Sequence, residues 1–424
     1  MATKPALKAS NRSKRNQFTM LKKGFKFLGK ILLTILSIFV MFLIAYLINP
    51  DYVQKKTLSF VYPTLNISDA HANKITTEVP EVYELMQIAC SLTDTFQKDN
   101  NLIQKKTAYY TDVENHFMKM KNHPLILKIN SFILENAYNQ STMAIRFLSL
   151  NYNINEQEKL VNNGSINLNG FLQTVLKSKA FLLSKNEDLV NDFIKKSDFK
   201  AFYKKHTAYY KILENNNVIL CDFENMKEWL EGKFSSSYSS YRIIFSPLTG
   251  GFHNTMSFKD KKRNEEQTFM FVNAPPKNIT HLTKDALEIK ASRQARIVFT
   301  EIDHNYVNPL TNKNLDELND TMKDLTFWNS QKKGMYRSNY KTFNEYMTWG
   351  VFNLYATDTY SAKNIDSILK IQTNFMDNGR KFHHFTAFSN ELLKQYKEKQ
   401  QPKIEELYPS MLLWMKNKEK QSIQ

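Results

Sequence analysis

The 424-residue chain contains few of the residues that interrupt helices or cross-link small folds: 10 glycines, 11 prolines and 2 cysteines. The scarcity of glycine and proline favours long helices over a loop-rich architecture, because both residues weaken or end helices. Two cysteines exclude a disulfide scaffold, and their spacing excludes a zinc knuckle built from cysteine pairs. In an oxidising compartment Cys90 and Cys221 could form one disulfide, and two buried free thiols are the alternative.

The chain also lacks the motifs of several functional classes. It has no glycine-rich phosphate loop and no serine or cysteine nucleophile motif. Its net charge of +17 is unevenly placed, because nine basic and no acidic residues fall in the first 30 positions, which leaves a net +8 for the rest. There the basic residues are interspersed with acidic ones, and no basic stripe alternates with aromatics. No nucleic-acid partner is predicted.

The basic segment 1–30 is followed by an apolar run from Ile31 to Ile48. A helix of that length spans roughly 27 Å, close to the thickness of the hydrocarbon core of a membrane. The positive-inside rule then predicts a cytoplasmic tail at 1–30 and a single-pass signal anchor at 31–48 in the inner (cytoplasmic) membrane. A cleaved signal peptide is the alternative, although no small-residue cleavage signal follows the run. Both alternatives place the chain after residue 50 in the periplasm or outside the cell.

Beyond the anchor we expect a stalk at 49–74, one large domain at 75–400 and a C-terminal tail at 401–424. Apolar spacing predicts helices at 79–96, 112–120, 131–148, 167–183, 188–213, 283–308 and 342–358. Runs of β-branched and aromatic residues predict strands at 218–221, 241–246, 255–258 and 268–272. The expected fold class is therefore helix-rich α+β, with a helical part at 75–215 and a small sheet with long helices at 216–400.

The segment Ala295 to Leu310 is similar to the helix of a zinc hydrolase in which one ligand is replaced. In a His-Glu-x-x-His motif, two histidines one turn apart bind zinc and the glutamate activates a metal-bound water. This chain reads Thr300-Glu301-Ile302-Asp303-His304, so threonine stands at the first ligand position. A hydroxyl is a poor zinc ligand beside imidazole. Asp303 does not replace it, because it lies about 100° around the helix from His304.

The order of short motifs along the chain resembles that of the bacterial family of unknown function DUF4932, whose members are similar to gluzincin-type zinc metallopeptidases. The resemblance spans residues 75–397 and is carried by Val79–Leu85, Tyr110–Phe117, His123-Pro124, Phe199–Tyr203, Ser246–Gly251, Phe299–Pro309 and Asn344–Trp349. It implies a zincin-like domain, in which a small sheet precedes two long ligand-bearing helices.

The resemblance also implies roles for individual residues. His304 becomes a zinc ligand, and Glu345, on the next long helix, becomes a further ligand. Glu301 becomes the general base that deprotonates a metal-bound water. Gly250 and Gly251, with the strand beside them, would form an edge on which an extended peptide or protein substrate pairs.

The replacement of a ligand by Thr300 leaves three functions open. The first is a membrane-anchored, exported metallopeptidase-like protein that is weakly active or inactive. The second is an active zinc-dependent peptide hydrolase of the cell envelope, in which His253, His383 or His384 supplies the missing ligand. The third is a non-catalytic scaffold that binds peptides or proteins at the same place.

Overall fold

The computed structural model describes residues 64–136, 138–167, 183–330 and 336–421, together with Thr34, Ser37 and Met41. The chain divides into two compact units, Met1–Val61 and Tyr62–Gln424. Most of the expected signal anchor at 31–48 and of the expected helix at 167–183 lies outside the described residues. Within the described residues, no helix has both the length and the apolar character needed to cross a membrane.

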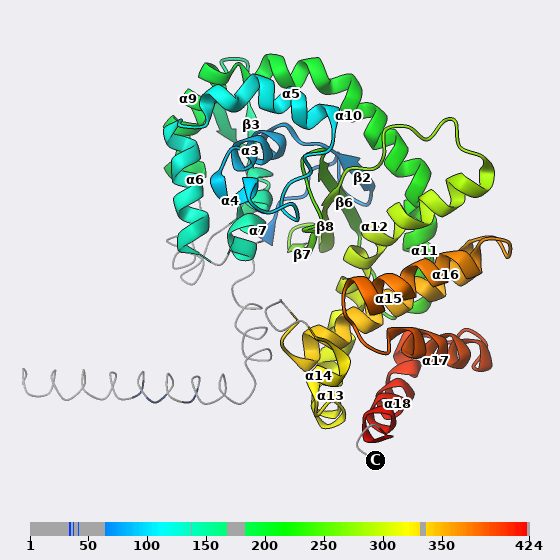
Figure 1. The fold of residues 1–424 in the computed structure, drawn as a ribbon. Helices are drawn as coiled ribbons and strands as arrows, with labels where there is room; N and C mark the ends of the chain where they lie inside the picture. The colour runs from blue at the N-terminus through cyan, green and yellow to red at the C-terminus, as the bar shows by residue number, and fades with distance from the viewer. Residues whose placement is uncertain are drawn as a thin grey trace, which may run out of the picture. The chain divides into compact units, whose positions relative to one another are not determined.

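The second unit is a helix-rich α+β domain, which confirms the fold class expected from the sequence (Figure 1). Its strands are β1 (Thr64–Leu65), β2 (Ile75–Glu78), β3 (Tyr152–Ile154), β4 (Leu160–Asn162), β5 (Ile166–Asn167), β6 (Ser240–Ser246), β7 (Asn254–Asp260) and β8 (Glu265–Asn273). The helices of its first half are α3 (Glu81–Ser91), α4 (Asp94–Gln97), α5 (Ala108–Phe117), α6 (Pro124–Glu135), α7 (Tyr138–Ser149), α9 (Glu187–Ser197), α10 (Phe199–Cys221) and α11 (Phe223–Lys233). The second half contains α12 (Lys284–Lys313), α13 (Leu315–Thr321), α14 (Leu325–Trp328), α15 (Asn339–Thr359), α16 (Ile365–Asn374), α17 (Phe385–Glu398) and α18 (Tyr408–Gln421). Short 3₁₀ turns (η1, Met118–Met120; η2, Leu183–Lys185; η4, Ile404–Leu407) and one π-helical turn (η3, Phe375–Gly379) complete the domain.

The main sheet has four strands in the order β2-β6-β8-β7, with β2, β6 and β8 parallel and β7 antiparallel to β8. Both faces of the sheet are buried. Along β6, Ile243 and Phe245 belong to the main hydrophobic core, whereas Ile244 between them belongs to a second cluster. Alternate side chains of a strand point to opposite faces, so the two clusters cover the two faces. This explains why β6 is apolar without alternation, as is typical of parallel strands.

The long helix α12 lies on the main-core face of the sheet and connects it to α15 and α10. Its first turn is capped by Thr283, whose hydroxyl accepts a hydrogen bond from the backbone N–H of Ala286. We expected this helix to end at Asn308, before Pro309, but it continues to Lys313. Pro309 cannot donate to the carbonyl of Asn305, and the hydroxyl of Tyr238 donates to that carbonyl instead, at 2.6 Å.

Several expectations from the sequence are corrected by the structure. Residues 218–221, expected as a strand, form the last turn of α10. The single helices expected at 79–96, 131–148 and 188–213 are each two helices, namely α3 and α4, α6 and α7, and α9 and α10. The segment 401–424, expected as a tail, contains η4 and α18, whose Met411, Leu412 and Met415 are part of the main core. Short apolar runs fit a strand and a buried helix equally well, which explains the first error.

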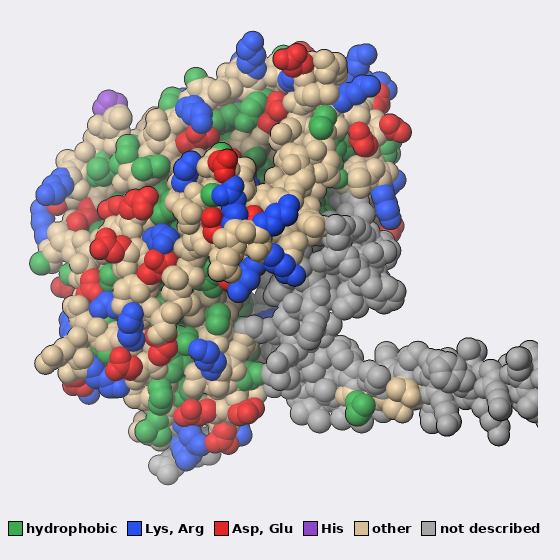
Figure 2. Space-filling view, turned by 180° about the vertical axis from the view of Figure 1, so that it is seen from behind, with side chains coloured by type: hydrophobic (Ala, Val, Ile, Leu, Met, Phe, Trp, Pro, Cys, Tyr) green, Lys and Arg blue, Asp and Glu red, His purple; other side chains and the backbone are tan. Residues whose placement is uncertain are grey.

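The two cysteines are separate buried thiols, so the alternative of a disulfide is wrong for this structure. Burial raises the pKa of the Cys90 thiol to about 12. At the surface, Figure 2 shows acidic and basic side chains interspersed over the face in view, which agrees with the mixed charge pattern of the sequence.

Gly350 allows α15 to pack closely on α17. A Cβ atom at this position would lie 2.7 Å from Cδ2 of Leu392 and 3.2 Å from a ring carbon of Phe388, and both side chains are fully buried. We expect Gly350→Ala to lower the free energy of unfolding by about 1–2 kcal/mol, because overpacking outweighs the gain in helix propensity. Chemical denaturation would measure this.

Gly232 provides the matched control, because it also lies in a helix but a Cβ there would meet nothing within 4 Å. Gly232→Ala is expected to stabilise the protein slightly. Equal effects of the two substitutions would contradict the close packing at Gly350.

Candidate functional site

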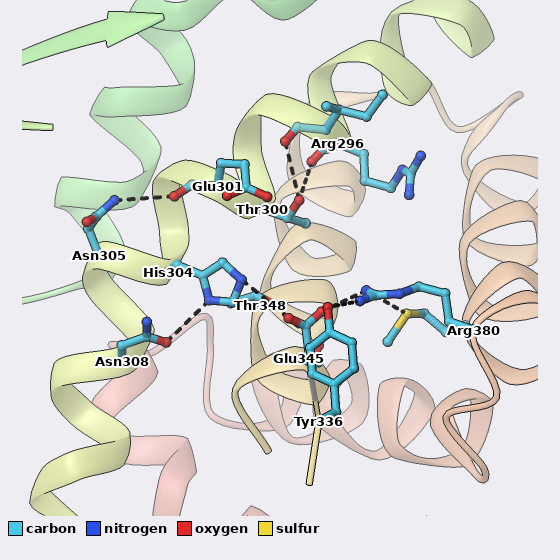
Figure 3. A network of polar contacts seen from close by, with 12 residues as sticks. Arg296, Thr300, Glu301, His304, Asn305, Asn308, Tyr336, Glu345, Thr348 and Arg380 are labelled. Atoms are coloured by element: carbon cyan, nitrogen blue, oxygen red, sulfur yellow. Dashed lines mark hydrogen bonds and ion pairs between the residues drawn. The ribbon is translucent and has the colours of Figure 1, made fainter. Parts of the chain in front are cut away.

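The structure brings together two of the residues that the sequence singled out. His304 comes from α12 and Glu345 from α15, and the imidazole Nε2 lies 3.6 Å from Glu345 Oε1 (Figure 3). On its other side, the His304 ring contacts the side-chain oxygen of Asn308 through Nδ1, at 3.3 Å. Glu345 is only 7% exposed. The imidazole and the carboxylate therefore form a largely buried pair.

A residue that the sequence did not single out, Arg380, completes this arrangement. Its Nη1 lies 2.7 Å from the second carboxylate oxygen of Glu345, and its Nη2 donates to the hydroxyl of Tyr336. The guanidinium lies about equally close to three aromatic rings, those of Tyr336, Trp349 and Phe382, at 5.1 Å from each centroid. Together Glu301, His304, Tyr336, Glu345 and Arg380 are called the Glu345 cluster below.

The local backbone explains how Arg380 reaches Glu345. Helix α16 runs directly into the π-helical turn η3, and the backbone N–H of Arg380 closes that turn on the carbonyl of Phe375. A π-turn rotates the following residue relative to a regular α-helix. Arg380 is thereby placed beside α15, although it lies 35 residues beyond Glu345 in the sequence.

The charges within the cluster stabilise one another. Burial opposes ionisation of Glu345, but the positive charge of Arg380 and the hydrogen bond and charge of His304 outweigh it and lower its pKa to about 2. Burial likewise opposes protonation of His304, yet the hydrogen bond and charge of Glu345 raise its pKa above the ordinary value. Below the raised pKa of His304, the arrangement is an imidazolium, a carboxylate and a guanidinium in a row.

Glu301 lies one turn from His304 on α12, but its carboxylate forms no hydrogen bond or ion pair within the described part of the chain. Burial raises the pKa of Glu301 to about 7. The charge of His304 opposes this rise, and the charge of Glu345 adds to it. Glu301 can therefore exchange a proton near neutral pH, as a general base requires, but it lacks a partner in the cluster to act on.

This shift of the Glu301 pKa has a consequence for stability. Between about pH 4.5 and pH 7 the unfolded chain has this carboxyl ionised and the folded chain keeps it protonated, so stability falls as pH rises through that window and is then constant. We expect Glu301→Gln to remove this loss, so that the variant gains about 3 kcal/mol relative to wild type between pH 4 and pH 8. Chemical denaturation of both proteins at pH 4 and pH 8 measures this gain. A difference in the free energy of unfolding that does not change with pH would contradict the raised pKa of Glu301.

Thr300 lies on the same helix face as His304, but its hydroxyl is bonded within its own helix. Its hydroxyl donates to the backbone carbonyl of Arg296 in its own helix, at 2.9 Å, as threonines within helices often do. Over the described ranges, no three or more histidine, cysteine, aspartate or glutamate side chains are grouped so that they could hold a metal ion. The structure thus brings His304 and Glu345 together without a third such ligand.

Gly250 and Gly251 lie in the turn before the edge strand β7. A Cβ atom on Gly250 would lie 2.6 Å from the backbone oxygen of Asn101, and one on Gly251 would lie 2.5 Å from the Asn101 side chain. The glycines are therefore required by a close approach of the segment around Asn101. Their expected part in substrate pairing stays a prediction.

The edge strand itself lies beside the cluster. Asn305, next to His304 on α12, donates to the hydroxyl of Thr255 at 2.8 Å and accepts from that of Ser257 at 2.7 Å. Both partners are on β7. Among the strands that the structure describes, β7 pairs only with β8. No described strand pairs with its other edge, although β1 packs against β7 and the backbone N–H of Ile67 donates to Asp260 at the end of β7.

None of the three other histidines considered from the sequence contacts His304 or Glu345 by a hydrogen bond or ion pair within the described residues. His253 has a buried Nε2 with no partner there, and burial, followed by the charges of Arg146 and Arg296, lowers its pKa to about 3. His384 stacks on Phe327 with ring centroids 4.4 Å apart, and the backbone of His383 is bonded to that of Trp328.

These features define a helix-rich α+β domain with a largely buried imidazole–carboxylate–guanidinium cluster next to β7, the edge strand of its main sheet. The chain belongs to the family described as Domain of unknown function (DUF4932), whose sequence profile matches residues 75–413. This confirms the family expected from the sequence motifs. No curated protein and no solved structure matches the chain.

Proposed function

We propose that this protein is a metallopeptidase-like protein that has lost catalysis and binds extended peptides or proteins without a metal. The observation that carries the proposal is the contact of 2.7 Å between Arg380 and Glu345. In a zinc peptidase the third ligand would give its carboxylate to the metal. Here one oxygen of that carboxylate is engaged by a guanidinium and the other faces His304.

The residues present do not fit a catalytic zinc ion. Such a site takes three protein ligands and leaves one position for water. The separation of 3.6 Å between His304 and Glu345 is compatible with two ligands of one ion, but Thr300 offers no imidazole and bonds its own helix. A permanent positive charge next to Glu345 also disfavours a second cation there. The cluster is better suited to hold α12, α15 and the Arg380 region together.

Binding of an extended chain is supported by the position of β7. This strand leaves one edge without a described partner, and Asn305 fixes it to the helix that carries the cluster. A peptide that pairs with β7 gains main-chain hydrogen bonds, while the neighbouring side chains select its sequence. Such recognition needs neither a metal nor a general base.

The test uses the full-length protein, zinc and a library of unstructured peptides. We expect less than stoichiometric zinc after purification, recovery of all peptides with unchanged mass, and slower hydrogen exchange at 254–260 when peptides bind. Zinc-dependent cleavage that Glu301→Gln abolishes would show that the second function, an active hydrolase completed by another ligand, is correct. In that case His253 would be the first residue to mutate.

We also propose that residues 31–48 anchor the protein in the inner membrane with the domain outside the cytoplasm. The support comes from the nine basic residues before the apolar run. Reporter fusions after Met20 and after Lys74 are expected to lie on opposite sides of the membrane. Fusions on the same side would contradict the proposed topology.

A further inference from the structure

A cavity of about 380 Å³ lies between the first half of α12 and the end of α16. Arg296 lines this cavity and packs on the Trp349 ring, with its guanidinium 4.5 Å from the ring centroid. Arg380 packs on the same ring at 5.1 Å. The polar side chains of the cavity include Lys290, Arg293, Arg296 and Gln372. No acidic side chain among the described residues lines it.

Two hydrogen-bond donors of this cavity have no acceptor in the described part of the chain. The Nε of Arg296 is buried without a partner, and so is the side-chain nitrogen of Gln372, a residue that is only 1% exposed. Buried donors are nearly always satisfied in folded proteins, because an unmet donor costs about 1–3 kcal/mol. These two nitrogen atoms have almost no exposed surface, so a ligand in the cavity cannot reach them. The two terminal guanidinium nitrogens of Arg296 also form no hydrogen bond within the described residues, and they remain partly exposed, so they are the donors that an acceptor from outside the chain can meet.

The charges around Arg296 favour an anion as that acceptor. Burial, and then the charges of Arg380 and Arg293, lower the pKa of Arg296 to about 10. Arg380 is neutralised by Glu345, but Arg296 forms no ion pair within the described residues. Figure 3 shows its side chain extending toward the side of the cluster on which Arg380 lies, away from His304. A negatively charged ligand would relieve the repulsion among these arginines.

The rest of the cavity is apolar, since Ile297, Ile371 and Phe375 also line it. We propose that this cavity binds an organic carboxylate, with the carboxyl group held by the guanidinium of Arg296 and an apolar body against these three side chains. A guanidinium matches the two oxygens of a carboxylate in geometry and charge. The source of the carboxylate is either a free organic acid or the C-terminal residue of a peptide. This inference stands apart from the proposed function, because no residue of β7 or of the Glu345 cluster lines the cavity.

The experiment measures binding of N-acetylphenylalanine, its C-terminal amide and inorganic phosphate to the full-length protein by calorimetry. We expect the acid to bind at least about tenfold more tightly than the amide, since a charge-assisted bond is lost in the amide. Arg296→Met is expected to weaken the binding of N-acetylphenylalanine by about tenfold or more. Lys370→Met removes an exposed charge from the same helix, α16, and is expected to leave binding unchanged.

Arg296 also supports Trp349, so a second variant keeps the test independent of folding. Arg293→Met removes an exposed positive charge that lines the cavity, and we expect it to weaken binding of the acid several-fold. Equal binding of acid and amide, or unchanged binding in both variants, would overturn the proposal. Tighter binding of phosphate than of the acid would overturn the assignment to an organic carboxylate. The source of the carboxylate is a peptide C-terminus if a longer peptide with a free C-terminal carboxyl group binds more tightly than N-acetylphenylalanine and the same peptide with a C-terminal amide does not.

Discussion

A chain that carries both Thr300→His and Arg380→Met is expected to bind zinc roughly 100-fold more tightly than either single variant. Thr300→His adds an imidazole one turn from His304 on the same helix face, which restores the two-histidine pair. Arg380→Met frees the carboxylate oxygen of Glu345 that the guanidinium engages at 2.7 Å. Outer-sphere partners alone change metal affinity by about 10–100-fold, and here one ligand is added and another is released.

The single variants are expected to gain little, for different reasons. Thr300→His leaves a positive charge and a competing donor on Glu345, whereas Arg380→Met leaves only His304 and Glu345 as ligands. The matched control is Thr300→Val with Arg380→Met, which has the same change at Arg380 and adds no ligand. Competition with a chromogenic chelator measures the affinities. If Thr300→His alone equals the double variant, Arg380 does not compete with a metal and the proposed function loses its main support.

The sequence predicted the α+β class and the principal elements around the cluster, because they have strong local signals. The apolar spacing of α12 and α15 and the aliphatic character of β6 are of this kind. The continuation of α12 past Pro309 could not be predicted in the same way. The carbonyl of Asn305 that Pro309 leaves free accepts a hydrogen bond from Tyr238, which lies 67 residues before Asn305 in the sequence.

The proximity of His304 and Glu345 followed from a resemblance to a family, and the structure places them together. Arg380 could not be found by the same reasoning. It matches no motif, and its contact with Glu345 depends on a π-turn that sequence patterns do not reveal. Arg296 looks in the sequence like an ordinary basic residue on a helix surface. Its lack of an acidic partner becomes visible only when α12 and α16 are packed together.

The role of the cluster in holding the fold leads to the second large effect, the response to loss of Glu345. Glu345→Gln leaves the guanidinium of Arg380 largely buried without its counter-charge and removes the charge that raises the pKa of His304. Breaking a buried ion pair from one side destabilises proteins by about 3–5 kcal/mol, and we expect a loss near the lower end of this range because both side chains keep some exposure.

The double variant Glu345→Gln with Arg380→Met is expected to recover much of that loss. Replacing both members of a buried pair by uncharged groups removes the unpaired charge and is often nearly neutral for stability. The single and double variants together form a thermodynamic cycle that isolates the coupling between the two residues. Lys416→Met, which breaks an exposed ion pair with Asp320, is the control and is expected to have little effect.

The pH dependence of the same variants gives an independent check with a defined sign. Because the pKa of Glu345 is lowered to about 2 in the folded protein, its contribution to stability is fully present above about pH 4.5 and is lost as pH falls toward 2. The difference between wild type and Glu345→Gln should therefore be largest near pH 5 and shrink below pH 4.5. It should also be smaller at a pH above the raised pKa of His304, where the imidazole is neutral. Urea denaturation at pH 7, 5, 4 and 3.5 measures it. Two results would contradict this coupling. One is a difference in the free energy of unfolding that is unchanged down to pH 3.5, and the other is a double variant no more stable than Glu345→Gln. Either would show that Glu345 and Arg380 act separately and that their charges do not hold α15 to the Arg380 region.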